Sequence, residues 1–213
     1  MKLYSYFRSS AAYRVRIVLN LKKIDVEFAS INLVKGDQKS ESYAKVSAQG
    51  LVPTLELDDG RIINQSLAIC EWLDANYKTP VLIPNDSFQA ARVRACALMI
   101  ACDVHPVNNL RVLQYLEHEL GIDELKKNQW YRHWVEQGFQ AIEKMLAGST
   151  YCFGDEPGLA DAFLVPQVFN ARRFEVDMNS YPKISAVDIA CSEIQAFIDA
   201  SPDNQADNPL QAT

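Results

Sequence analysis

The stretch that decides the fold is Arg8–Arg16, RSSAAYRVR, which directly follows the alternating apolar run Leu3–Phe7, LYSYF. The alternation predicts a strand, and the residues from Ala11 onward predict a helix. Two hydroxyl side chains, Ser9 and Ser10, stand at the junction, where the first N–H groups of a helix have no internal acceptor and the helix dipole is positive. A serine at such a place either caps the helix or binds an anion, and the residues alone leave both roles open.

The first eighty residues continue as alternating strands and helices. The pattern predicts a strand over residues 26–33, a short helix over 40–46, a strand opened by Pro53, its hairpin partner over 61–64, and a helix over 67–77. The order β-α-β-α-β-β-α indicates a parallel strand pair with a right-handed crossover and an antiparallel hairpin at the sheet edge. This is the topology of a thioredoxin-like domain, predicted here for residues 1–80.

The rest of the chain is predicted to be helical. A linker with two prolines covers residues 78–86, and helical patterns follow over 87–120, 130–145, 158 onward and 184–198. A break is expected near His105, because Pro106 cannot donate a backbone hydrogen bond. The polar tail over 201–213 is expected to be poorly ordered. The fold class is therefore α/β followed by all-α, with the helical domain over residues 87–213.

Composition and charge exclude several classes of partner. The chain has 213 residues, a net charge of −6 and no basic block, so we expect neither a nucleic acid nor an anionic membrane surface as partner. No apolar run approaches the roughly eighteen residues of a membrane span, and the N-terminus lacks a signal-peptide core, which together predict a cytoplasmic protein. The five cysteines form no C-x-x-C pair and no histidine–carboxylate cluster is present, so neither a disulfide framework nor a metal site is expected.

The combination of domains and several motifs resemble the zeta class of the cytosolic glutathione transferases. The motifs are Ser9-Ser10 followed by Arg14-Val15-Arg16, the Val52-Pro53 turn, Gln65-Ser66, Asp103–Arg111, Val165-Pro166-Gln167 and Asn170–Phe174. The segment Asp103–Arg111 resembles the second-domain motif of maleylacetoacetate and maleylpyruvate isomerases. One departure is Ala11, which replaces the signature cysteine of the class. A mechanism that requires that thiol therefore cannot operate in this chain.

The resemblance implies glutathione as the cofactor. The implied glutathione-binding residues are Gln38, Val52, Gln65, Ser66, His105, Asn109, Leu110 and Arg111. Lowering a thiol pKa of about 8.5 by two units requires about 2.7 kcal/mol of thiolate stabilisation. One hydroxyl donor to a charged acceptor contributes roughly 1.5–3 kcal/mol, so either Ser9 or Ser10 could be the catalytic donor. His105 could equally satisfy the broken backbone before Pro106.

The implied substrates are small dicarboxylic diketo acids with a cis double bond conjugated to a carbonyl. Addition of a thiolate to that bond allows rotation, and loss of glutathione returns the trans isomer. Arginine binds carboxylates and developing oxyanions well, and Arg8, Arg111 and Arg173 are the substrate-binding candidates, although surface arginines are often only solvated. Arg14 and Arg16 are interpreted as structural because they lie within the first helix.

The favoured function is isomerisation of maleylacetoacetate to fumarylacetoacetate in tyrosine and phenylalanine breakdown. Isomerisation of maleylpyruvate, from gentisate breakdown, is the close alternative, since nothing in the sequence fixes the length of the substrate pocket. A general transferase acting on small α-halo acids would use the same thiolate. A non-catalytic interaction module is the alternative from another class. By resemblance we also expect a homodimer.

Overall fold

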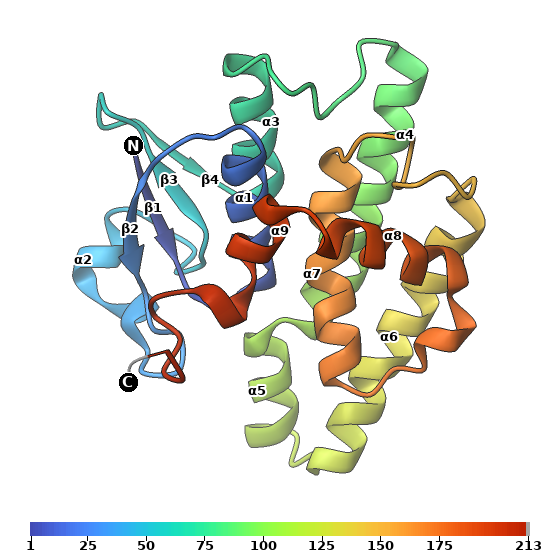
Figure 1. The fold of residues 1–213 in the computed structure, drawn as a ribbon. Helices are drawn as coiled ribbons and strands as arrows, with labels where there is room; N and C mark the ends of the chain where they lie inside the picture. The colour runs from blue at the N-terminus through green and yellow to red at the C-terminus, as the bar shows by residue number, and fades with distance from the viewer. Residues whose placement is uncertain (212–213) are drawn as a thin grey trace. The chain divides into compact units, whose positions relative to one another are not determined.

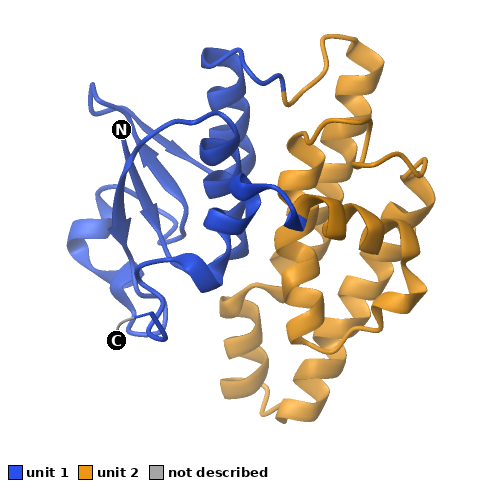
Figure 2. Cartoon of the chain, viewed as in Figure 1, with its two compact units in different colours: residues 1–81, 192–213 blue, residues 82–191 orange. Residues whose placement is uncertain are grey.

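The computed structural model describes residues 1–211 and divides the chain into two compact units. The first unit contains residues 1–81 and 192–213, and the second contains residues 82–191 (Figure 2). Residues 212 and 213 lie outside the described part of the chain. The sequence predicts a helical domain over residues 87–213. In the structure, the segment from Ser192 onward instead groups with the first unit.

The first unit is built on a four-stranded sheet in the order β2-β1-β3-β4. Its elements are β1 (Lys2–Ser5), α1 (Ser10–Leu21), β2 (Glu27–Ser30), a 3-10 turn (Asp37–Lys39), α2 (Glu41–Ala44), β3 (Thr54–Glu56), β4 (Ile62–Asn64), α3 (Ser66–Asn76), α9 (Gln195–Ala200) and a 3-10 turn (Pro202–Asn204). β1 pairs with β2 in parallel and with β3 antiparallel, and β3 pairs with β4 antiparallel. The predicted thioredoxin-like topology is confirmed.

α1 and α3 cover one side of this sheet, and α2 lies on the other (Figure 1). Leu3 of β1 and Leu55 of β3 face each other in the ladder and are completely buried. Val15 and Val18 of α1 and Leu73 of α3 are also completely buried. Their burial between sheet and helices supplies the hydrophobic stabilisation of this unit. This packing holds the N-terminus of α1 after the carboxyl end of β1, and the N-terminus of α3 after the β3–β4 hairpin.

A fully buried lysine joins α1 to the end of α3. Lys22 Nζ lies 2.8 Å from Asp74 Oδ1, and it donates to the carbonyl oxygens of Tyr77 at 2.6 Å and Pro80 at 2.7 Å. One ammonium therefore neutralises a carboxylate and satisfies two carbonyls at the C-terminal end of α3. Cations are favoured at that end of a helix.

Replacing Lys22 with methionine is expected to destabilise the protein by about 3–5 kcal/mol, because it removes the ammonium that pairs with the half-buried Asp74 carboxylate and satisfies two carbonyl oxygens. Urea unfolding would measure the change. The matched control is Lys23→Met, since Lys23 is the next residue and is exposed. Equal stability of the two variants would contradict the assignment of Lys22 as a structural charge.

The second unit is helical. Its elements are α4 (Ser87–Leu98), a π-helical turn (Met99–Val104), a 3-10 turn (Pro106–Asn108), α5 (Leu110–His118), α6 (Glu124–Met145), α7 (Leu159–Arg173), a 3-10 turn (Met178–Ser180) and α8 (Pro182–Ser192). The break predicted near His105 is present, and His105 N–H donates to Ile100 O at 2.8 Å in the π pattern. A Cβ on Gly138 would lie 2.2 Å from Val104 Cγ2. The missing side chain at Gly138 thus lets α6 approach the π-helical turn.

The last predicted helix, over residues 184–198, is wrong in one respect. The structure ends α8 at Ser192 and starts α9 at Gln195, because Ile194 is extended with φ −93° and ψ 123°. The two helices bury their apolar faces in different units: Val187 lies in the second, and Phe197 is buried in the first. A continuous apolar stripe in the sequence thus serves two separate cores.

The tail that was expected to be poorly ordered is held by its own amide side chains. Gln205 Nε2 donates to the carbonyl oxygens of Asp199 at 2.7 Å and Ser201 at 2.9 Å. Asn208 is buried, and its Nδ2 donates to Pro202 O at 3.2 Å. Within residues 201–211 polar side chains therefore satisfy nearby backbone carbonyls. Within residues 1–211, no helix combines the length and the apolar character that crossing a membrane requires.

Candidate functional site

Ser9 lies where the strand β1 gives way to the helix α1. It is the N-cap of α1, with φ −69° and ψ 115°, and its Oγ accepts a hydrogen bond from Ala12 N–H at 3.2 Å. Ser9 is half-buried, whereas Ser10 is the first residue of the helix and is buried. A hydroxyl that accepts one bond still has a proton to donate. Both readings of the sequence therefore apply to Ser9, which caps the helix and can also donate to an anion.

A second helix N-terminus in the same unit carries Gln65 and Ser66. Gln65 is the N-cap of α3 and has a positive φ of 73°, and its Nε2 donates to Gln49 Oε1 at 2.8 Å. Ser66 is buried, and its Oγ accepts a hydrogen bond from Arg14 Nη1 at 3.2 Å. The helix N-terminus and the guanidinium both favour negative charge. These residues can hold a carboxylate.

Arg14 also belongs to this region. Its place within the first helix predicts a structural role, and its buried guanidinium reaches from α1 to Ser66 on α3, a contact that the sequence did not indicate. Burial raises the pKa of the Cys70 thiol on α3, and the positive charge of Arg14 partly opposes that rise. Arg14 therefore adds positive potential behind the start of α3. The sequence signal was only the buried face of α1, which is shared by many structural residues.

Gln38 lies in the 3-10 turn before α2, and Val52 lies in the loop between α2 and β3. The Val52–Pro53 bond is cis, as the resemblance implied. The Val52 side chain packs in a cluster with Tyr6 and Tyr43. Gln38 Nε2 donates to Leu33 O at 3.3 Å, while its Oε1 is buried and accepts no hydrogen bond from residues 1–211. An orphaned buried acceptor costs about 1–3 kcal/mol, and an N–H group of a peptide-like ligand would satisfy it.

In the second unit, His105 and Asn109 lie on either side of the break before α5. Asn109 is the N-cap of α5, and its Oδ1 accepts from Arg111 N–H at 3.2 Å. Its Nδ2 lies 3.4 Å from His105 Nε2. Leu110 and Arg111 form the exposed first turn of α5. The predicted second-domain residues therefore form one group around a helix N-terminus.

Segments next to Arg111 and Arg173 contact neighbouring residues of α6. Val107, just before α5, accepts a hydrogen bond from Trp130 Nε1 of α6 at 3.0 Å. Phe174, just after Arg173, stacks on Tyr131 of α6 with ring centroids 3.6 Å apart. The start of α5 and the end of α7 are thus both anchored on residues 130–131, at one end of the unit (Figure 1).

The three candidate arginines are exposed, but their surroundings differ. Arg8 and Arg173 each lie over the ring of an adjacent phenylalanine, with the guanidinium carbon 5.8 Å from the Phe7 ring centroid and 4.9 Å from that of Phe174. Within residues 1–211, the Arg111 and Arg8 side chains form no ion pair. Both charges are therefore available to an anionic ligand. That Arg8, Arg111 and Arg173 bind one substrate stays a prediction.

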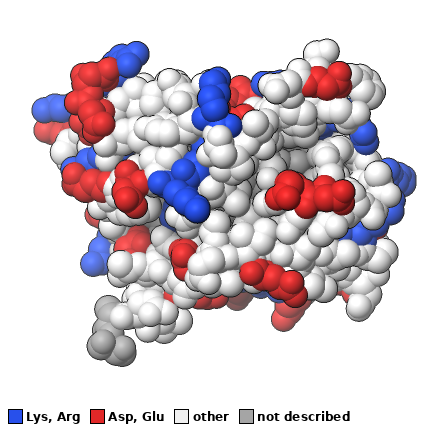
Figure 3. Space-filling model, turned by 45° about the horizontal axis from the view of Figure 1, so that its top comes forward, with Lys and Arg blue, Asp and Glu red and all other residues white. Residues whose placement is uncertain are grey.

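Charge on the face drawn in Figure 3 is mixed. On this face, Lys and Arg side chains alternate with Asp and Glu side chains among the described residues, without an extended patch of one sign. Three or more His, Cys, Asp or Glu side chains do not gather into a possible metal site anywhere in residues 1–211.

Comparison with known proteins identifies both parts of the chain. The family described as the glutathione S-transferase N-terminal domain matches residues 3–81, and the glutathione S-transferase C-terminal domain matches residues 128–199. A probable maleylacetoacetate isomerase of Vibrio cholerae is 45% identical over 96% of this chain and 97% of its own length. A maleylpyruvate isomerase of a Ralstonia species is 45% identical over 98% of this chain and 100% of its own length.

Solved structures agree with these matches. The holo structure of a maleyl pyruvate isomerase, described as a bacterial zeta-class glutathione S-transferase, has a TM-score of 0.94 and 45% identity over 97% of this chain and 99% of that chain. A maleylacetoacetate isomerase of Anaeromyxobacter dehalogenans, solved with glutathione bound in the active site, has a TM-score of 0.87 and 38% identity. It covers 98% of this chain and 97% of its own.

Proposed function

The chain belongs to the zeta class of the glutathione S-transferase family, and from that premise we propose that it is a glutathione-dependent cis–trans isomerase of maleylacetoacetate. The product is fumarylacetoacetate. The observation that carries the proposal is 45% identity, across nearly the whole chain, to relatives named for this isomerisation or for that of maleylpyruvate. The hydroxyl and guanidinium groups described above suit the reaction chemically.

Bound glutathione supplies the thiolate that adds reversibly to the cis double bond. Three features of this chain fit the tripeptide: the Ser9 hydroxyl, the α3 N-terminus with Ser66, and the orphaned Gln38 Oε1. Ser66 and the backbone at the start of α3 would hold the γ-glutamyl carboxylate, with Arg14 behind them. Gln38 Oε1 would accept a peptide N–H. Val52, Gln65, His105, Asn109 and Leu110 would complete the binding site.

Ser9 donates its proton in a hydrogen bond to the sulfur and keeps the thiol ionised near neutral pH. Because α1 begins at Ser10, the helix dipole adds to the stabilisation of negative charge at this point. The Ser9 hydroxyl needs no general base for this role, since a hydrogen bond to the ionised form is enough to lower the thiol pKa.

The substrate's two carboxylates require cations. Arg8, Arg111 and Arg173 would bind them and stabilise the negative charge that develops on the carbonyl oxygen. Exposure of Arg111 and Arg8 without ion pairs within residues 1–211 supports this assignment. The planar guanidinium of arginine can donate two hydrogen bonds to one carboxylate, which fixes the orientation of a small acid.

Maleylpyruvate is the second candidate substrate. The Ralstonia relative carries that name at the same identity of 45%, and the holo structure of a maleyl pyruvate isomerase matches with a TM-score of 0.94. We further propose that the protein acts in the cytoplasm as a homodimer. A general transferase acting on α-halo acids would share the thiolate but would depend less on three arginines.

Steady-state isomerisation of both acids with catalytic amounts of glutathione tests the proposal. We expect turnover of maleylacetoacetate, no turnover without glutathione, and no net consumption of the tripeptide. Faster turnover of maleylpyruvate would instead support the second candidate. Failure to isomerise either acid, despite binding to immobilised glutathione, would contradict both and favour the general transferase. Absence of both binding and activity would favour a non-catalytic interaction module.

A further inference from the structure

The peptide that leads into Ser9 is held from the far end of the chain. Phe7 N–H donates to Asp207 Oδ2 at 2.9 Å, and Phe7 C=O accepts from Arg16 Nη2 at 2.9 Å. The preceding carbonyl, of Tyr6, accepts from Ser9 N–H at 3.0 Å and from Arg16 Nη1 at 3.4 Å. Two buried or half-buried ionic side chains thus fix the backbone on both sides of Phe7.

Asp207 is itself held in place. Its Oδ2 also accepts from the Ser30 hydroxyl of β2 at 3.0 Å. The tail that carries it is fastened to α1, because Arg16 Nε donates to Ala200 O at 2.9 Å and Asn20 Nδ2 donates to Ala196 O at 3.0 Å. These hydrogen bonds therefore hold the Asp207 carboxylate between β2 and the start of α1.

Electrostatics tie this carboxylate to Arg16. Burial lowers the pKa of Arg16 to about 10, and the negative charge of Asp207 opposes that fall. Arg16 therefore stays charged at neutral pH. Removing the carboxylate would leave a buried guanidinium without its compensating charge, which is costly. The same pair thus fixes the geometry and balances the charge behind the Ser9 segment.

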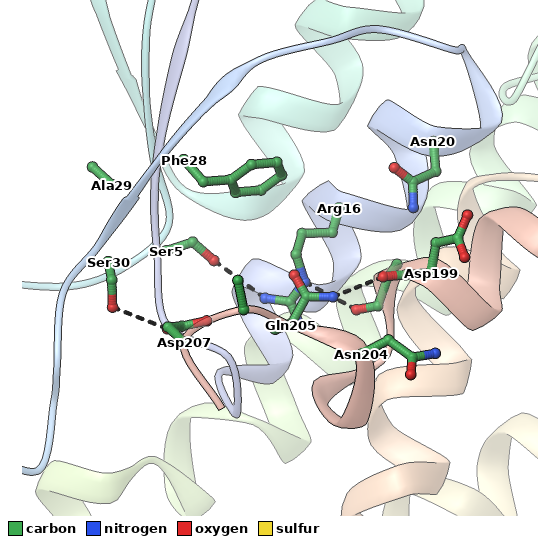
Figure 4. Close-up of a pocket in the computed structure, with 12 residues that line it drawn as sticks. Ser5, Arg16, Asn20, Phe28, Ala29, Ser30, Asp199, Asn204, Gln205 and Asp207 are labelled. Atoms are coloured by element: carbon green, nitrogen blue, oxygen red, sulfur yellow. Dashed lines mark hydrogen bonds between the residues drawn. The ribbon is translucent and has the colours of Figure 1, made fainter. Parts of the chain in front are cut away.

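A pocket opens beside this pair. It has a volume of about 460 Å³ and is lined by β1, α1, β2 and residues 199–207 of the tail, all within the first unit. Figure 4 shows Arg16 in the middle of the lining residues and Asp207 joined by a hydrogen bond to Ser30. A small carboxylic acid added to the solution could therefore reach the place of the Asp207 side chain.

We propose that Asp207 is a positioning residue for Ser9: through the Phe7 amide it sets the direction of the hydroxyl that keeps the glutathione sulfur ionised. The catalytic consequence, an ionised glutathione sulfur, rests on the proposed function. The geometric consequence, a fixed Phe7 amide, can be measured in the protein without glutathione. Catalytic groups need placement within about 0.5 Å. Only Arg8 separates Phe7 from Ser9, so a rotation of the Phe7 peptide displaces the donor.

The test compares Asp207→Ala with Asp203→Ala, a control in the same tail whose exposed side chain forms no hydrogen bond with the described residues 6–9. Amide exchange of Phe7 is measured without glutathione. Ultraviolet absorbance of the thiolate is then titrated with pH after glutathione is added. For Asp207→Ala we expect amide exchange of Phe7 to be about 10-fold faster and the thiolate titration to move upward by about one pH unit. We also expect kcat to change by a larger factor than the KM for glutathione.

Two further arms separate positioning from general stability. Formate should restore part of the thiolate signal to Asp207→Ala through the open pocket, and Asp207→Asn should retain part of it because an amide oxygen still accepts from Phe7 N–H. Should Asp207→Ala fail to fold, Ser30→Ala removes one donor to the carboxylate without touching residues 6–9, and a smaller shift in the same direction is expected.

The outcomes are distinct. Identical exchange and titration in Asp207→Ala and Asp203→Ala would overturn the positioning role, and so would an unchanged Ser30→Ala where Asp207→Ala does not fold. If the native protein formed no thiolate with glutathione, the proposed function would fail. In that case faster Phe7 exchange in Asp207→Ala would still support the anchor, and unchanged exchange would overturn it.

Discussion

Replacing Ser9 with alanine is expected to lower isomerisation about 10- to 100-fold at neutral pH, because the thiolate loses a hydrogen bond worth roughly 1.5–3 kcal/mol. Loss of a donor to the ionised form raises the thiol pKa by about one to two units. The loss of activity is therefore largest at low pH and shrinks as the pH rises past the new pKa. A pH profile of kcat/KM, with the thiolate absorbance of bound glutathione, measures both effects.

The control must separate donation from capping, since Ser9 Oγ also accepts from Ala12 N–H. Ser9→Asp keeps an acceptor for that amide but has no proton to donate, so it should preserve stability and still raise the thiol pKa. Ser9→Thr keeps both functions and should stay close to the native protein. A normal thiol pKa in Ser9→Ala, with a raised one in Ser10→Ala, would transfer the role to Ser10.

Replacing Arg173 or Arg111 with alanine is expected to reduce isomerisation of the dicarboxylic acids about 100- to 1000-fold, the range seen when one preorganised donor to a developing charge is removed. Glutathione conjugation of an uncharged electrophile such as 1-chloro-2,4-dinitrobenzene should change far less. The ratio of the two activities measures how much of the effect belongs to the substrate's charge.

Arg172→Ala is the matched control for Arg173→Ala. Arg172 is adjacent and exposed, but its guanidinium is engaged by Asp188 Oδ2 at 2.6 Å. We expect it to leave the activity ratio unchanged. A parallel loss of both activities in Arg173→Ala would instead indicate damage to glutathione binding or to folding. A ratio as low in Arg172→Ala as in Arg173→Ala would remove Arg173 from the site.

The order of strands and helices was predictable because its signals are local. Alternation over Leu3–Phe7, the proline at residue 53 and the backbone-blocking Pro106 each act within a few residues. The strand after Pro53 and the break near His105 are confirmed, and the first strand is present but covers Lys2–Ser5. The strand over 26–33 was predicted too long, since β2 covers only Glu27–Ser30. Strand ends depend on the partner strand, which local sequence does not specify.

Features that join distant segments were not predictable. Arg14 contacts Ser66, and Asp207 contacts Phe7 two hundred residues away. Neither pairing produces a periodic or compositional pattern in the sequence. The tail illustrates the point: its Asn, Gln and Asp content predicts disorder, yet Asn208 is buried and its side-chain amide donates to the Pro202 carbonyl. Composition says which groups must be satisfied and not which partners satisfy them.

The return of residues 192–211 to the first unit has a consequence for how the protein is made. Arg16 Nε donates to the carbonyl oxygen of Ala200, and the Phe7 N–H donates to Asp207 Oδ2. A nascent chain that has only emerged as far as residue 81 therefore contains every strand of the sheet but lacks these partners. Although domains generally fold from the N-terminus during synthesis, here the ribosome must release the last residues before the first unit can be completed.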